Sequence, residues 1–375
     1  ILGAGLMLAG QTGRFGDSGA LYWLLLTFSV LGGAGIGAAY VCPIATCVKW
    51  FPDKRGLITG LAVAGFGAGA FFFAPLARGL IAGTPYSLFG VSLFNLPALG
   101  LFQTFFSLGV IFLVAVVAGA QFLNNPPAGY CPPGWTPPKP AAGAVPKADL
   151  GPREMLRTRI FWILWLTFFA GCTAGLMVIM KASPIWQSFR KAVLPPPIGY
   201  ADATQIATAG AMAVSILAIF NSLGRILWGR ISDSIGRKPT LIAIFLICGT
   251  TMLGLDWMRG YPFYLGGVCL IGLCFGGFLA TYPAITADFF GTKNIGANYG
   301  WMFTAFGAGG LAGPYLAARL MTVASRVEYA AHPTEDTIFK IFEIGNYRPA
   351  FLIAGVACLG AGWLATALRK PGAQA

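Results

Sequence analysis

Charge is the scarcest property of this 375-residue chain, in which only 10% of residues are Asp, Glu, Lys or Arg. Soluble domains usually have about a quarter of their residues charged, so the composition excludes an ordinary soluble fold. The chain has 12 acidic against 25 basic residues and a single histidine. The apolar runs contain no paired carboxylates, no nucleophile beside a base and no cluster of metal ligands. We therefore predict that the protein is not an enzyme and uses no metal or cofactor.

Apolar sequence is abundant instead: 57% of the residues are hydrophobic, with 30 phenylalanines and 52 glycines. Runs of the roughly 20 residues that cross a bilayer as a helix recur along the chain, whereas barrel strands would alternate over about 10 residues. We predict an all-α membrane protein, with the lipid bilayer as its partner. The predicted spans, of which the first is clipped, are 1–10, 21–48, 56–82, 101–123, 160–181, 206–228, 239–256, 261–287, 297–320 and 347–368.

The distribution of charge between the spans is more informative than the net charge of +13, which in a soluble protein would suggest nucleic-acid binding. Lys and Arg gather in alternate connections, and such an excess marks the cytoplasmic face. The connections predicted to be cytoplasmic are 49–55, 124–158, 229–238 and 288–296. We expect a multi-pass monomer in the plasma (cell inner) membrane, with no nucleic-acid partner.

A proline-rich stretch at 124–147 cannot hold a helix and divides the spans into two sets. The two sets resemble each other, because F-G-A-G at 66–69 with Pro75 matches F-G-A-G at 306–309 with Pro314. The offset is about 240 residues, and internal repeats of six spans are a known plan of transporters.

The same offset places the counterparts of the spans at 160–181 and 206–228 before residue 1. We therefore expect a protein of about twelve spans, of which this chain holds about ten and lacks the first two. A protein with only ten spans is the alternative. The expected parts are an N-terminal bundle at 1–123 with spans 3 to 6, a cytoplasmic linker at 124–158, and a C-terminal bundle at 159–375 with spans 7 to 12.

Two stretches resemble a known family. The loop after the span at 206–228 has a motif that resembles the characteristic loop motif of the major facilitator superfamily. The residues of this motif are Gly229, Asp233, Gly236, Arg237 and Lys238. W-F-P-D-K-R-G at 50–56, followed by A-G-F-G-A-G at 64–69, is similar to the oxalate/formate antiporter family and its monocarboxylate-carrier relatives. The resemblance implies two pseudo-symmetric helical bundles that rock around a central site.

One arginine needs an explanation, because a charged side chain inside a span costs roughly 2.5–3.5 kcal/mol. Arg225 lies two turns before Asp233, so it is roughly 12 Å from the predicted cytoplasmic face, and its side chain tilts toward the midplane. Tyr40, Asn221 and Phe306 reach a similar depth by the same count. Arginine can bind a carboxylate with two parallel hydrogen bonds while aromatic rings exclude water. We predict a site for a small organic anion. A buried ion pair is the alternative, although no span offers an acidic partner.

The resemblance implies further site residues. Carriers of oxalate in this family hold the dicarboxylate with two cations, of which Arg225 matches one while the second falls on Phe306. Phe275 and Phe303 fall on aromatic positions of the same pocket, with plain packing as the alternative for each ring. A single cation favours a monoanion such as formate or lactate over oxalate.

Two positions bear on coupling and access. Proton-coupled monocarboxylate carriers have an aspartate where this chain has Asn221, and an amide cannot carry a proton. We therefore favour anion exchange by alternating access. Proton-coupled symport is the first alternative, and a membrane sensor or scaffold without transport is the second. Lys181 is expected near the outer surface, where it either snorkels or attracts the anion.

The loop motif is also predicted to gate the carrier. Its glycines allow close approach, the Asp233 carboxylate can face the N-terminus of a neighbouring helix, and Arg237 can pair across the loop. Asp53/Arg55 and Asp288/Lys293 are expected to form similar gating pairs, with solvated loops as the alternative. The predicted gating residues are Gly229, Asp233, Gly236, Arg237, Lys238, Asp53, Arg55 and Asp288.

Overall fold

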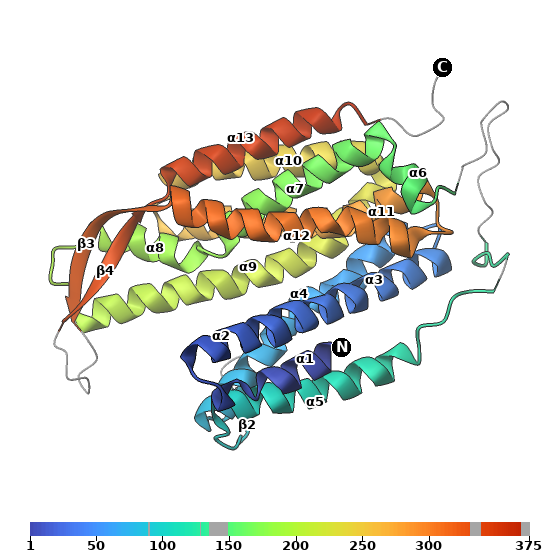
Figure 1. Cartoon of the computed structure of the whole chain (residues 1–375). Helices are drawn as coiled ribbons and strands as arrows, with labels where there is room; N and C mark the ends of the chain where they lie inside the picture. Colours follow the sequence, from blue (N-terminus) through green and yellow to red (C-terminus); the bar gives the residue numbers. More distant parts are fainter. Residues whose placement is uncertain (89–90, 128, 135–148, 331–338, 369–375) are drawn as a thin grey trace. The chain divides into compact units, whose positions relative to one another are not determined.

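The structure is a computed structural model that describes residues 1–88, 91–127, 129–134, 149–330 and 339–368 (Figure 1). The predicted linker at 124–158 therefore lies partly outside the described residues. The chain forms two compact units. The first unit holds Ile1–Pro52 and Gly65–Trp135, and the second holds Asp53–Ala64 and Thr136–Ala375.

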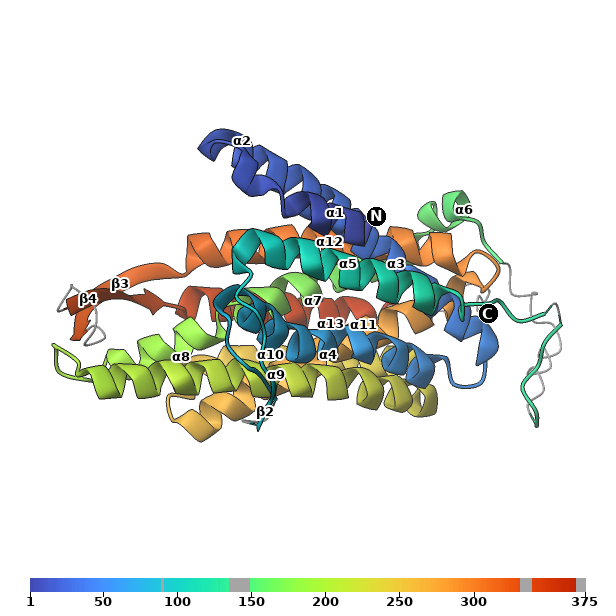
Figure 2. The same ribbon diagram turned by 90° about the horizontal axis from the view of Figure 1, so that it is seen from below.

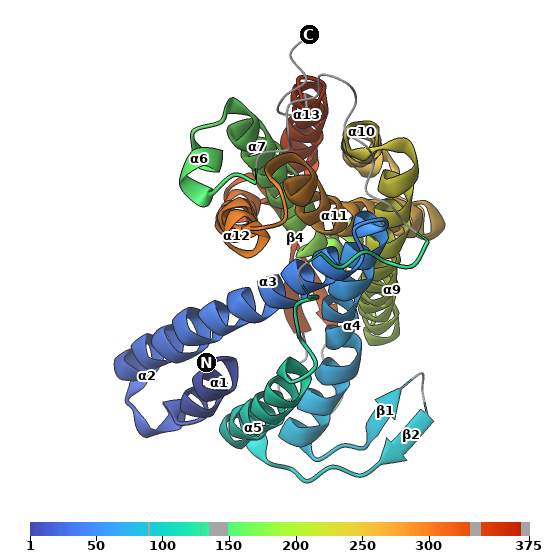
Figure 3. The same ribbon diagram turned by 90° about the vertical axis from the view of Figure 1, so that its right-hand side faces the viewer.

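The first unit is built from helices and a short hairpin. Its elements are α1 (Leu2–Ala9), η1 (Thr12–Arg14), α2 (Asp17–Leu24), η2 (Leu25–Gly32), α3 (Gly33–Trp50), the later turns of α4 (Arg55–Ala82), β1 (Tyr86–Leu88), β2 (Val91–Phe94) and α5 (Gly100–Ala120). Helices α1 and α5 lie side by side, as Figure 3 also shows. They approach closely because a Cβ on Gly3 would lie only 2.6 Å from the Gly109 carbonyl oxygen.

The second unit contains the remaining helices and a longer hairpin, together with the first turns of α4. Its elements are α6 (Pro152–Leu156), α7 (Arg159–Ile179), α8 (Ala182–Lys191), α9 (Tyr200–Ile235), α10 (Arg237–Gly254), η3 (Leu255–Trp257), α11 (Tyr261–Phe290), α12 (Ile295–Leu320), β3 (Thr322–Ala330), β4 (Phe339–Asn346) and α13 (Arg348–Ala365). Helix α9 packs along α11, α7 packs against α12 and α13, and α10 packs against α13 (Figures 1 and 2). Helix α11 is apolar on all sides and mostly buried, as expected for a central helix.

Helices occupy all ten predicted spans. Within the described residues, seven stretches are long and apolar enough to cross a membrane. They are Asp17–Trp50, Gly100–Ala120, Arg159–Ile179, Tyr200–Ile235, Arg237–Trp257, Tyr261–Phe290 and Arg348–Ala365. Of the other three predicted spans, α4 and α12 form helices of 28 and 26 residues, and α1 has only 8 residues. The protein is therefore a multi-pass membrane protein of mostly helical fold.

The prediction that the fold is entirely helical is wrong at the two hairpins. In the longer one, Val327 lies opposite Phe342 and Tyr329 opposite Lys340. β-Branched and aromatic residues favour strands, and a connection outside the apolar spans is free to form them. Ile198 also joins this hairpin: its N–H donates to the Glu328 carbonyl at 3.0 Å, and its carbonyl accepts from Ala330 N–H at 2.9 Å.

Candidate functional site

The loop motif is shaped by Gly236, which has a φ of +93°. Helix α9 ends at Ile235 and α10 begins at Arg237, so this glycine is the only residue between them. Residues with a side chain rarely adopt this left-handed backbone conformation, which explains why the position is a glycine. The sharp turn places the Arg237 guanidinium 2.7 Å from an oxygen of Asp233.

Asp233 caps the first turn of α4. Its two carboxylate oxygens accept hydrogen bonds from Gly56 N–H at 2.9 Å and Leu57 N–H at 2.8 Å. The first N–H groups of a helix have no partner within the helix, and they carry its positive dipole end. The two helices can approach this closely because a Cβ on Gly56 would overlap the Gly229 carbonyl oxygen. The geometry expected of Asp233 and Gly229 is therefore present, while a gating role for them stays a prediction.

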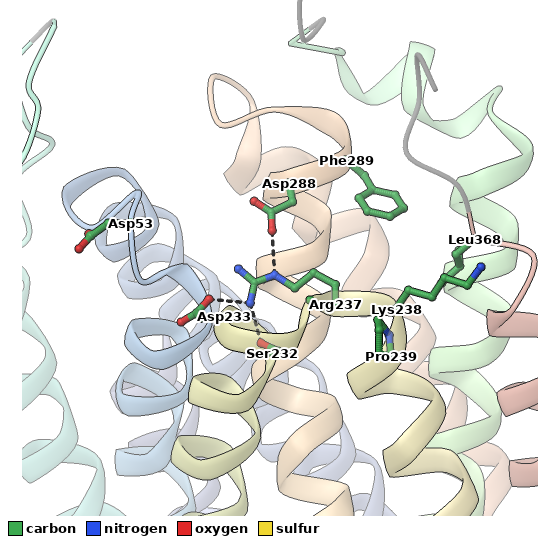
Figure 4. A pocket seen from close by; sticks show the side chains of 10 residues that line it. Asp53, Ser232, Asp233, Arg237, Lys238, Pro239, Asp288, Phe289 and Leu368 are labelled. Carbon is green, nitrogen blue, oxygen red and sulfur yellow. Dashed lines mark hydrogen bonds and ion pairs between the residues drawn. The ribbon is translucent and has the colours of Figure 1, made fainter. Parts of the chain in front are cut away.

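Asp288 is held by two arginines from different helices. Arg237 Nε donates to one carboxylate oxygen at 2.7 Å, and Arg55 donates to the other at 2.8 Å. Arg237 also donates to Ser232 Oγ at 2.6 Å (Figure 4). These side chains are 10–19% exposed, so water screens their charges only partly. Arg55, Asp233, Arg237 and Asp288 together form what we call the ion-pair cluster.

The cluster borders a cavity of about 420 Å³, which Lys238 and Asp53 also line (Figure 4). Asp53 is exposed, and its nearest ion-pair partner among the described residues is Lys54 at 3.9 Å. Sequence reasoning missed Ser232. Its hydroxyl, one turn before Gly236, was the only signal that could have indicated it.

The predicted partners within the gating pairs are wrong. Arg55 binds Asp288 and not Asp53, because residues two apart at a helix start point to different sides. Lys293 is not paired with Asp288. Gly291 ends α11 with a φ of +90°, the chain turns away, and Lys293 N–H donates to Asp149 at 3.2 Å.

Arg225 lies on α9 and is buried, with 3% of its surface exposed. Its Nε donates to Asn221 Oδ1 at 3.3 Å, one helical turn earlier, and its Nη1 donates to the Val63 carbonyl of α4. Both acceptors are neutral oxygens, so these two hydrogen bonds solvate the guanidinium without cancelling its charge. The hydrogen bond between Asn221 and Arg225, which were predicted to lie at a similar depth, is a finding of the structure.

Glycines allow α9 to pack closely against α4 and α11 at the level of Arg225 and Asn221. A Cβ on Gly60 of α4 would overlap the Arg225 carbonyl oxygen, and a Cβ on Gly276 of α11 would overlap the Asn221 carbonyl oxygen. Such backbone contact requires small residues at the helix interface. Arg225 and Asn221 are therefore held by rigid helix packing on both sides, which fixes the position of the guanidinium.

Two of the predicted aromatic residues, Phe303 and Phe306, stack on each other on α12. The Phe303 and Phe306 rings lie 4.8 Å apart at 5°, and Phe303 also contacts Tyr299 at 5.6 Å. Phe275 on α11 is buried and packs at Gly175 of α7, where a Cβ would overlap its ring. The structure thus brings together Phe303 with Phe306, and Asn221 with Arg225.

Two predicted site residues lie elsewhere. Tyr40 belongs to the first unit, where it is buried on α3 with its ring 5.5 Å from that of Phe66. Its participation in a site with Arg225 stays a prediction. Lys181 lies at the junction of α7 and α8 and lines a different cavity, near the β3–β4 hairpin.

Comparison with known proteins identifies the class. Residues 191–374 match the family model described as Major Facilitator Superfamily. The chain is 30% identical over 330 residues to the oxalate:formate antiporter of Oxalobacter formigenes, covering 86% of this chain and 68% of that protein. It is 29% identical over 313 residues to the uncharacterized MFS-type transporter YhjX of Escherichia coli (strain K12), covering 83% and 67%.

The fold agrees with this match. A crystal structure of the superfamily transporter FucP in the outward conformation aligns with a TM-score of 0.60 at 14% identity, covering 98% of this chain and 80% of that one. The chain belongs to the major facilitator superfamily. It is therefore a secondary transporter of a small solute and not an enzyme, and the predicted superfamily is confirmed.

Proposed function

We propose that the protein exchanges small organic monoanions by alternating access and that Arg225 binds their carboxylate. The observation that carries the proposal is a rigidly held guanidinium, 3% exposed, in the apolar helix α9. A buried charge is costly in such a helix, and in transporters it commonly marks the substrate pathway. A relative with similarity over most of this chain is named an oxalate:formate antiporter, which supports an anionic substrate.

The chemistry of the surroundings favours a monoanion. Arg225 donates hydrogen bonds to the neutral Asn221 amide and to a backbone carbonyl, and one carboxylate carries the charge complementary to one guanidinium. Phe306 stands where the resembling oxalate carriers have a second cation, and a ring offers no charge to a second carboxylate. Formate, lactate and similar short monocarboxylates therefore fit better than oxalate.

We propose anion exchange because residue 221 is not a group that can carry a proton. An amide at Asn221 cannot take up and release a proton during the cycle, whereas a carboxylate could. Reorienting an uncovered guanidinium through apolar surroundings is unfavourable, so the carrier moves with an anion bound in both directions. Phe275 and Phe303 of the second unit are the proposed aromatic walls of the site.

The ion-pair cluster is the proposed latch on one conformation. It joins the start of α4, the α9–α10 turn and the end of α11 through interactions of 2.7–2.9 Å. We propose that this end faces the cytoplasm of a cell whose plasma membrane holds the carrier. Opening that side would require Asp233 to release the first turn of α4.

Proteoliposomes loaded with unlabelled formate test the proposal through uptake of labelled formate. We expect Arg225→Ala to abolish exchange and Arg230→Gln, which removes an exposed arginine on the same helix, to leave it unchanged. Unchanged exchange in Arg225→Ala would show that the site is wrong. Uptake that needs no internal anion and makes the outside medium alkaline would instead establish proton symport. Saturable binding without flux would indicate a sensor.

A further inference from the structure

The β3–β4 hairpin and α8 lie at the same end of the second unit (Figure 1). A second cavity lies there, where α7 passes into α8. Its volume is about 610 Å³, which is larger than the about 420 Å³ of the cavity at the ion-pair cluster. Pockets that bind small molecules usually fall between about 300 and 1,000 Å³. This cavity is therefore large enough for a small organic molecule.

The charged residues that line this cavity include one more cation than anions. Arg326 on β3 and Glu343 on β4 lie directly opposite each other, with an Nη2 to Oε1 distance of 2.9 Å. Lys181 lines the same cavity, and no described carboxylate lies within ion-pair distance of its ammonium. Because Glu343 balances Arg326, the lining carries a net charge of about +1, which suits a monoanion.

The rest of the lining includes apolar side chains. Met321, at the end of α12, and Phe342 of β4 are among the residues that line the cavity. The buried Lys191 contacts the Phe342 ring, with its ammonium 3.8 Å from the ring centroid. A cation beside apolar walls favours an organic anion with an apolar body over an inorganic ion.

Hydrogen bonds between distant segments preform the cavity. Ser188 of α8 lies 3.2 Å from the Tyr347 hydroxyl, and its Oγ accepts from Gly345 N–H at 3.2 Å. Lys191 also lies 4.5 Å from the Tyr329 ring centroid, so both hairpin strands are docked on α8. Walls that need no reordering make binding less costly.

We propose that this cavity is a second anion site, which captures organic monocarboxylates before they reach Arg225. Lys181 binds the carboxylate, and Met321 and Phe342 cover the apolar body. As a capture site it rests on the proposed transport function, but binding can be measured without transport. A substrate with an alkyl chain gains more from this site than formate does, because only the chain can contact the apolar walls.

Equilibrium binding of labelled butyrate to the purified Arg225→Ala protein isolates this site. We expect saturable binding that Lys181→Gln, added to Arg225→Ala, weakens about fivefold, the effect of one partly exposed ion pair. Glu343→Gln leaves Arg326 unbalanced and should tighten binding about fivefold for the same reason. Arg190→Gln removes an exposed charge from α8 outside the cavity and should change nothing. No butyrate binding to Arg225→Ala, or equal binding with and without Lys181→Gln, would overturn the proposal.

A transport assay provides a second test of this site. With Arg225 intact, Lys181→Gln should raise the KM for external butyrate about fivefold with kcat unchanged, and it should affect formate less. A lower kcat with an unchanged KM would contradict capture. If the unmodified protein exchanges no anion, the proposed function fails, and the butyrate binding assay still decides whether the second site exists.

Discussion

Replacing Asp233 by asparagine is expected to weaken the attachment of the first turn of α4, so that its capped amides exchange hydrogen about 30-fold faster. Each hydrogen bond to a charged group contributes about 1.5–3 kcal/mol, and Asp233 accepts two, from Gly56 and Leu57. Asparagine keeps the shape and one acceptor oxygen, so one neutral bond of about 1 kcal/mol survives. Arg237 keeps its bond to Asp288. With the lower value of about 1.5 kcal/mol for each bond, the net loss is about 2 kcal/mol, and 1.4 kcal/mol corresponds to tenfold.

Hydrogen exchange measures this loss directly, because the Gly56 and Leu57 amides have no acceptor within their own helix. We expect both to exchange about 30-fold faster in Asp233→Asn. The Ile58 amide, which donates to the Lys54 carbonyl at 3.0 Å, should change less and serves as an internal reference. Asp53→Asn, which removes an exposed carboxylate nearby, is the matched control. If the Gly56 and Leu57 amides exchange at the same rate in Asp233→Asn, Asp233 does not secure α4.

Two further substitutions test the packing around the proposed site. Asp288→Asn should lower the free energy of unfolding by about 1–3 kcal/mol in a detergent melt, because Arg55 and Arg237 both lose a charged partner. A melt that matches the unmodified protein would contradict this. Gly60→Ala should cost about 1–3 kcal/mol and reduce exchange, since its Cβ overlaps the Arg225 carbonyl oxygen. Gly65→Ala on the same helix has open space around its Cβ and should be tolerated; equal effects of the two would refute the packing argument.

Local pattern was enough to predict the spans, and it also accounts for the contact between Asn221 and Arg225 on α9. Apolar runs of span length mark helices whatever they pack against, and all ten predicted ranges are helical. Asn221 and Arg225 are four residues apart on one helix, so their contact follows from helical geometry. Gly236 could be assigned to a tight turn for the same reason, because its conformation depends on the local chain.

Contacts between distant segments could not be predicted in this way. Arg55 and Asp288 are 233 residues apart, and the predicted partners were simply the nearest opposite charges in sequence. The Val63 carbonyl that accepts from Arg225 has no sequence signature at all, since every residue has a carbonyl. The β3–β4 hairpin was missed because hydropathy identifies spans and says little about the connections between them.

The Asn221→Asp variant tests whether the substrate carboxylate binds Arg225 beside residue 221. Asn221 Oδ1 already accepts from Arg225 Nε, so a carboxylate there would form an ion pair with the guanidinium. That pair competes with the substrate carboxylate, and formate exchange at neutral pH should therefore fall at least about tenfold, as expected for a contact of about 1.4 kcal/mol. A variant that exchanges as well as the parent protein at neutral pH would show that the anion does not bind there.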